Sequence, residues 1–217
     1  IESLLNRAPV VLKHRNRAMA AEDYEWLAKE ASRNVSRVKV LPNFSPEGKF
    51  STGWGTVIIV PESLDPQPVP STELKRQVTE YLTARCPAVV NLKVMPPSYV
   101  KIDVGAELVT SVIDATATVE MEARRKISEF LHPLTGSAEG KGWGFGFAPC
   151  ISDIYSILEK IEDVDHVNNV TVGLHDSSKV MKIDDASVMV KLPEYALPCS
   201  GEHEITVKWE NSKKKGG

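Results

Sequence analysis

The sequence predicts an α+β fold built from two small helix-on-sheet units with mostly antiparallel sheets. The chain has 217 residues, which suits two units of roughly 100 residues each. Segments with the apolar spacing of helices alternate with short β-branched segments typical of strands. Proline-rich stretches, at 61–70 and at Pro96 and Pro97, separate these segments. Together these observations favour compact units that each pack helices on a sheet.

The first unit is expected over residues 15–112. Tyr24, Leu27 and Ala28 fall on one helical face, and Ser71 is placed to cap a second helix. In the last strand, Val100 and Ile102 alternate with polar residues. The expected elements are a helix over 20–31, strands over 35–41 and 56–60 separated by a loop over 43–53, a helix over 72–85, and strands over 89–95 and 99–109.

The second unit is expected over residues 113–210, followed by a disordered tail over 211–217 with three lysines. Its first helix carries an apolar stripe that includes Val119, Ala123 and Ile127. The expected elements are a helix over 115–131, a glycine-rich loop over 134–149, a helix over 153–161, and strands over 164–172 and 205–209.

Composition excludes several classes of partner. The net charge of -3 and the pI near 6.0 provide no basic surface for nucleic acid or anionic membrane. No apolar run approaches the roughly 20 residues of a membrane span. Cys86, Cys150 and Cys199 lie far apart, which is typical of a reducing, cytosolic origin. Because the chain begins at Ile1 and not at Met, we expect a fragment of a longer protein.

Motifs for chemistry are weak, so we expect no catalytic residue, no cofactor site and no metal site. No serine lies in a GxSxG turn, and no cysteine has the local signature of a nucleophile. His166 and His175 lie near several aspartates, a residue combination that can bind metal, but their spacing matches no established motif. The glycine loop follows a helix instead of a strand, which disfavours phosphate binding.

The glycine-rich loop interleaves glycine with three aromatic residues, Trp143, Phe145 and Phe147. Glycine permits tight turns, and aromatic rings supply large contact areas. The rings could pack on their own unit or contact a partner.

Several segments resemble baseplate J-like and baseplate assembly proteins of contractile phage tails and related injection particles. They run in the family's order over about residues 15 to 175. They are Arg15–Tyr24 (RNRAMAAEDY), Pro70–Leu74 (PSTEL) with Val78–Arg85, Phe130–Gly136 (FLHPLTG) with Gly140–Gly146 (GKGWGFG), and Ser152–Val164. Phe147 stands where the family often has arginine, and Ser137 replaces a glycine.

The resemblance implies a structural wedge component of a baseplate, made in the host cytoplasm, that is not an enzyme. It implies contacts with other wedge and hub proteins and self-association, without nucleic acid or membrane. The expected contact residues are Trp143, Phe145, Phe147, Arg17 and Tyr24. Two alternatives stay open: a carbohydrate-binding module, since exposed rings stack on sugars, and a small-molecule hydrolase near His166, His175 and Asp176.

Overall fold

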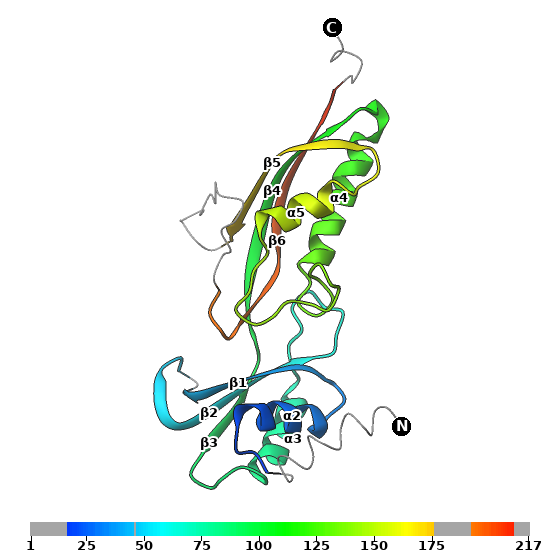
Figure 1. Ribbon diagram of the computed structural model, residues 1–217. Helices are drawn as coiled ribbons and strands as arrows, with labels where there is room; N and C mark the ends of the chain where they lie inside the picture. Colours follow the sequence, from blue (N-terminus) through cyan, green and yellow to red (C-terminus); the bar gives the residue numbers. More distant parts are fainter. Residues whose placement is uncertain (1–16, 46, 176–191, 211–217) are drawn as a thin grey trace. The chain divides into compact units, whose positions relative to one another are not determined.

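The computed structural model describes residues 17–45, 47–175 and 192–210. The chain divides into two compact units between Pro97 and Ser98 (Figure 1). The described residues form four α-helices and two three-stranded sheets, so the expected α+β class is confirmed. The boundary expected at 112/113 lies one strand later than this division, and the expected tail over 211–217 lies outside the described residues.

The first unit packs two helices on a sheet with the strand order β1-β2-β3. β1 pairs antiparallel with β2, and β3 pairs parallel with β2, so the chain crosses over through α3 between them. The elements are α2 (Ala21–Ala31), β1 (Val35–Phe44), β2 (Phe50–Pro61), α3 (Thr72–Thr83) and β3 (Asn91–Met95).

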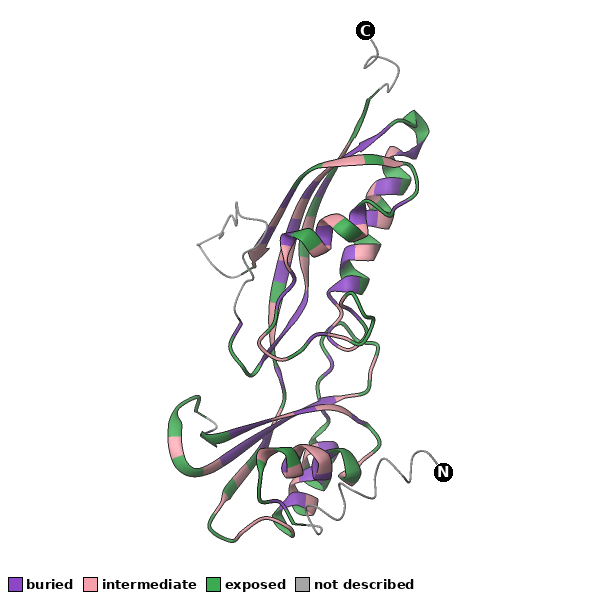
Figure 2. Ribbon diagram, in the orientation of Figure 1, coloured by how far each residue is buried: buried purple, intermediate pink, exposed green. Residues whose placement is uncertain are grey.

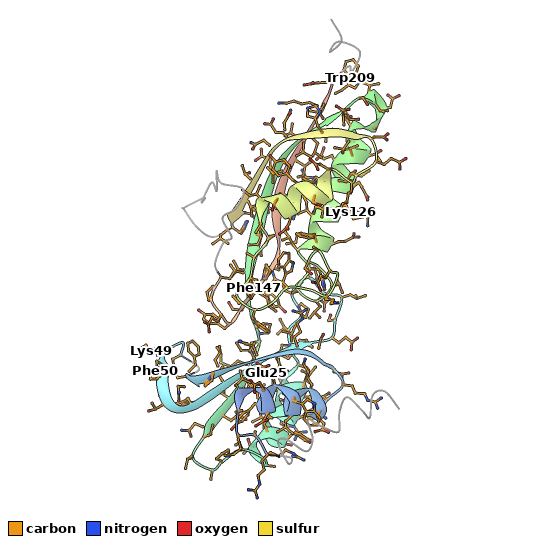
Figure 3. All side chains as sticks on the ribbon, in the orientation of Figure 1. Glu25, Lys49, Phe50, Lys126, Phe147 and Trp209 are labelled. Carbon is orange, nitrogen blue, oxygen red and sulfur yellow. The ribbon has the colours of Figure 1, made fainter. Side chains whose placement is uncertain are left out.

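The core of the first unit lies between these helices and the sheet. Its buried members include Leu27 of α2, Val57 of β2, and Val78 and Leu82 of α3, each 0% exposed. β1 is an edge strand, and Glu25 of α2 accepts a hydrogen bond from the Val40 amide of β1 at 3.2 Å (Figure 3). The carboxylate thereby satisfies a backbone donor of the edge strand.

The second unit has the strand order β5-β4-β6, with β4 antiparallel to β5 and parallel to β6. Buried residues recur along both helices and the three strands (Figure 2). They include Ile102, Leu108, Ile127 and Ile154, all 0% exposed. The elements are β4 (Ser98–Thr110), a 3-10 turn (Ile113–Ala115), α4 (Thr116–Phe130), α5 (Ile151–Leu158), β5 (Val164–Leu174) and β6 (Ala196–Trp209).

Two strand predictions differ from the structure. The expected loop over 43–53 includes the end of β1 and the start of β2, which pair from Val35 to Phe44. β6 begins at Ala196, well before the expected start at Ile205. Pairing with β4 holds this early part of β6 in a strand in spite of its proline, serine and glycine.

Candidate functional site

The glycine-aromatic loop (residues 134–149) is anchored by Trp143. The indole N–H of Trp143 donates a hydrogen bond of 2.8 Å to the carbonyl oxygen of Phe130, the last residue of α4. The two rings meet edge-on, with centroids 5.3 Å apart and an interplanar angle of 85°. Trp143 is only 8% exposed and belongs to the core of its own unit. Its large area therefore holds the loop against the end of α4.

The backbone of the loop folds tightly on itself. The amide of Gly142 donates to the carbonyl of Gly136, and the amide of Trp143 donates to the carbonyl of Pro133. A Cβ atom on Gly136 would lie 2.1 Å from the Phe130 carbonyl oxygen, so no side chain fits there. Nδ1 of His132 faces the backbone amides of the two residues after Pro133, at 3.3 and 3.2 Å. The loop thus satisfies its polar backbone groups locally.

Beyond Trp143 the loop turns its aromatic side chains toward the surface. Phe145 is half-buried. Phe147, which is labelled in Figure 3, is 57% exposed. The Phe147 ring lies over Gly144, where an added Cβ would approach the ring carbon to 2.9 Å. The amide of Gly146 donates to the carbonyl of Ala196 in β6. Of the loop's three aromatic residues, Phe147 is therefore the most exposed.

The other two expected contact residues lie in the first unit. Arg17 is exposed, whereas Tyr24 of α2 is 7% exposed and belongs to the core. Burial raises the pKa of the Tyr24 phenol, with smaller contributions from Cys86 and Asp23. A cavity of about 170 Å³ lies beside Tyr24 and is lined by residues without charge, including Met19 and Trp54.

A polar cluster in the second unit surrounds Asp103 of β4. Its Oδ1 accepts the amide N–H of Glu202 in β6 at 2.7 Å, and its Oδ2 lies 2.8 Å from Nδ1 of His175, just after β5. A single carboxylate thus joins the central strand to both of its neighbours. The expected alternation of apolar and polar residues over 99–109 agrees with Asp103 on the polar face of β4, whereas the part of β6 that completes the cluster was not predicted.

His203 of β6 extends the cluster toward α4. Its Nδ1 accepts the backbone N–H of Val104 at 3.2 Å, and its Nε2 lies 2.9 Å from the hydroxyl of Ser200. Because a backbone amide can only donate, the neutral ring carries its proton on Nε2 and donates it to Ser200. In this arrangement His203 cannot accept the Ser200 proton, so the pair lacks the geometry of an activated serine.

The residues expected for a hydrolase or a metal site do not form one cluster in the part of the chain that the structure describes. His166 contacts the adjacent Asp165 at 2.8 Å, His175 contacts Asp103, and Asp176 lies outside the described residues. Within residues 17–45, 47–175 and 192–210, no group of three or more histidine, cysteine or acidic residues is arranged to hold a metal ion. The helices among these residues are too short or too polar to span a membrane.

Comparison with known proteins identifies similarity at the level of structure. No protein-family model matches the chain, and no curated protein sequence matches it. Among solved structures, the chain is similar to a chain of the anti-feeding prophage baseplate, determined by cryo-electron microscopy with six-fold symmetry imposed, at a TM-score of 0.68 and 13% identity. The similarity covers 94% of this chain and 41% of that chain. The two proteins therefore share a fold, and this chain spans about two fifths of its structural relative.

Proposed function

We propose that this chain is a structural part of the baseplate of a contractile tail or tail-like injection particle, where it occupies a wedge position. The observation that carries the proposal is the fold shared with an anti-feeding prophage baseplate chain, which extends over 94% of this protein and so includes both units. The resemblance of the segments around Arg15–Tyr24 and Phe130–Gly146 to baseplate J-like proteins supports the same role. Its work is mechanical: it joins other wedge and hub proteins and further copies of itself.

The glycine-aromatic loop supports a role in contact. Trp143 fixes the loop to α4, and Phe147 extends from it with more than half of its side-chain surface in solvent. A ring held on an anchored loop loses little conformational freedom on binding, which favours its use at an interface. We assign Phe147 as the central contact, Phe145 as its partly buried neighbour, and Trp143 as the anchor that positions both.

In the first unit, Arg17 is assigned as the exposed contact residue and Tyr24 as the buried residue that supports it. Arg17 is exposed and can pair with an acidic group of a partner. Tyr24 is buried in the core that α2 forms on the sheet. His175 and His203 of the second unit have structural partners in the central strand of their own sheet, which supports a role without catalysis.

A complementation experiment tests the proposal. A particle-producing strain that lacks this chain receives the wild-type gene, a Phe147→Ala gene or an Ile113→Ala gene, and assembled particles are counted by electron microscopy. Ile113 is a matched control because it is 62% exposed, close to the 57% of Phe147, and lies in the same unit. We expect particles without this chain to lack complete baseplates, and Phe147→Ala to lower their number while Ile113→Ala does not.

The possible outcomes separate the parts of the proposal. Normal baseplates without this chain contradict the structural role itself. Normal assembly with Phe147→Ala, at unchanged protein level, contradicts only the loop contact. Self-association is tested independently by sedimentation of the purified 217-residue chain, where a strictly monomeric protein at high concentration contradicts it.

A further inference from the structure

The joint between β4 and β6 contains a β-bulge. Ile102 pairs with Ser200 and Val104 pairs with His203, so β6 contains one extra residue at this point. A bulge interrupts the regular ladder of backbone hydrogen bonds, and some backbone groups then need other partners. Here the imidazole Nδ1 of His203 accepts the Val104 amide at 3.2 Å. A titratable side chain has taken the place of a strand carbonyl.

The carboxylate of Asp103 closes the other side of the bulge. Its Oδ1 accepts the Glu202 amide at 2.7 Å, and Gly201 leaves room for it, since an added Cβ would lie 2.1 Å from that oxygen. An ionised carboxylate has no proton to donate, so Asp103 binds the Glu202 amide of β6 purely as a hydrogen-bond acceptor. The bulge is therefore fixed to β4 by two side-chain acceptors, Asp103 and His203.

His203 also links the bulge to α4. Its Nε2–H donates to the Ser200 hydroxyl at 2.9 Å, and that hydroxyl lies 3.2 Å from the hydroxyl of Ser128 on α4. Arg124 of α4 donates to the His203 carbonyl oxygen and also pairs with Glu120 at 3.0 Å. His203 thus contacts β4 through its ring, and α4 through its carbonyl oxygen and, by way of Ser200, through its ring.

We propose that His203 is a pH-sensitive clamp, which fastens the bulge of β6 to Val104 of β4 while its ring is neutral and opens at this point when the ring is protonated. The imidazolium ion carries a proton on each nitrogen, so Nδ1–H would face the Val104 N–H, donor against donor. The ring must then leave its position, and the Val104 amide loses its acceptor. Loss of the imidazole also frees the Ser200 hydroxyl from its donor, which loosens the link to Ser128.

The charges around the ring agree with this mechanism. The charged and titratable groups that face it are Asp103 on β4 and Arg124 on α4, with Glu120 paired to Arg124 and His175 paired to Asp103. Burial lowers the pKa of His203 below its ordinary value of 6.5, the Arg124 charge lowers it further, and the Asp103 charge opposes both. The neutral, clamping form is therefore the resident form at neutral pH.

The sign of the pH effect follows from linkage. When the clamp opens, the exposed ring regains its ordinary pKa and binds a proton more readily than the closed ring. The closed state is therefore fully favoured above about pH 6.5 and loses stability as the pH falls below that value. The clamp responds between about pH 5 and pH 8, where histidine is the only side chain whose unperturbed pKa lies.

Nuclear magnetic resonance of the whole 217-residue chain tests the clamp without a mutation. Long-range proton–nitrogen spectra report which ring nitrogen of His203 carries the proton, and hydrogen exchange reports the protection of the Val104 amide. We expect the Nε2–H form near neutral pH, and a loss of Val104 protection as the pH falls from about 8 to about 5, after correction for intrinsic exchange. A ring protonated on Nδ1 at neutral pH, or protection that does not change with pH, overturns the proposal.

The variant His203→Asn separates the clamp from other titrations. Its amide oxygen can still accept the Val104 N–H, but it does not titrate. We expect Val104 protection in this variant to be independent of pH, whereas His166→Asn, which alters a half-buried histidine of the same sheet, keeps the wild-type profile. The same loss of protection in His203→Asn as in the wild type assigns the effect to another group and overturns the proposal.

Discussion

Trp143 and Phe130 are joined twice, by an indole-to-carbonyl hydrogen bond of 2.8 Å and by an edge-on ring contact at 5.3 Å. The hydrogen bond connects the loop to the last residue of α4, and the ring contact packs the two aromatic side chains against each other. Because one residue supplies both contacts, the two can be separated by substitution. The strength of these two contacts determines how firmly the glycine-aromatic loop is held against α4.

Replacing Trp143 should destabilise the second unit in two steps. Trp143→Phe keeps a ring but removes the donor, so we expect a loss of about 0.5–1.5 kcal/mol. Trp143→Ala also empties the ring's space, so we expect about 3–5 kcal/mol. Denaturant unfolding measures both, and Phe147→Ala, at an exposed ring, should stay within about 0.5 kcal/mol. Equal costs for Trp143→Ala and Phe147→Ala would contradict the anchor.

Two glycines of the loop offer a matched comparison. Gly140 and Gly142 both have positive φ, at 67° and 76°, so alanine is strained at either position. A Cβ on Gly140 meets open space, whereas one on Gly142 would lie 2.4 Å from the Pro133 carbonyl oxygen. We expect Gly140→Ala to cost about 1–2 kcal/mol and Gly142→Ala clearly more. Thermal unfolding of the two variants checks the order, and a reversed order would show that the loop relaxes around Gly142.

The helices were predictable from sequence because each carries an apolar stripe that its sheet buries. α3, for instance, follows the expected cap Ser71 and buries Leu74, Val78 and Leu82. The first half of β6 was not predictable, since Pro198, Ser200 and Gly201 have low strand propensity, and only pairing with β4 fixes it. The His203 cluster depends on this register, which local sequence does not encode.

The contact residues illustrate the same limit. Aromatic residues in a glycine-rich loop indicate large contact areas, but sequence alone does not say which ring faces inward. The 8% exposure of Trp143 and the 57% exposure of Phe147 separate the two roles. Tyr24 and Arg17 divide in the same manner, one in the core and one at the surface.

The N-terminus of α3 gives a local test of helix capping. The Ser71 hydroxyl accepts the Leu74 amide at 3.1 Å, so it satisfies one of the free donors of the first turn. We expect Ser71→Ala to destabilise the first unit by about 1 kcal/mol and Ser71→Asp to retain most of that stability. Amide exchange at Leu74 measures the effect directly. Faster exchange in both variants would show that the hydroxyl itself, and not an acceptor in general, is needed.

The bulge between β4 and β6 predicts a strong coupling between Gly201 and Asp103. An alanine at 201 would place its Cβ 2.1 Å from Oδ1 of Asp103, so the carboxylate must move and release the Glu202 amide. We expect Gly201→Ala to cost about 1–3 kcal/mol in the wild-type background.

In the Asp103→Ala background the clashing oxygen is absent, although the Ile102 carbonyl oxygen at 2.9 Å still crowds the site. The cost of Gly201→Ala should therefore be smaller there, with a coupling energy of about 0.5–3 kcal/mol in a double-mutant cycle. Strictly additive costs would mean that the Asp103 carboxylate does not limit the space at position 201.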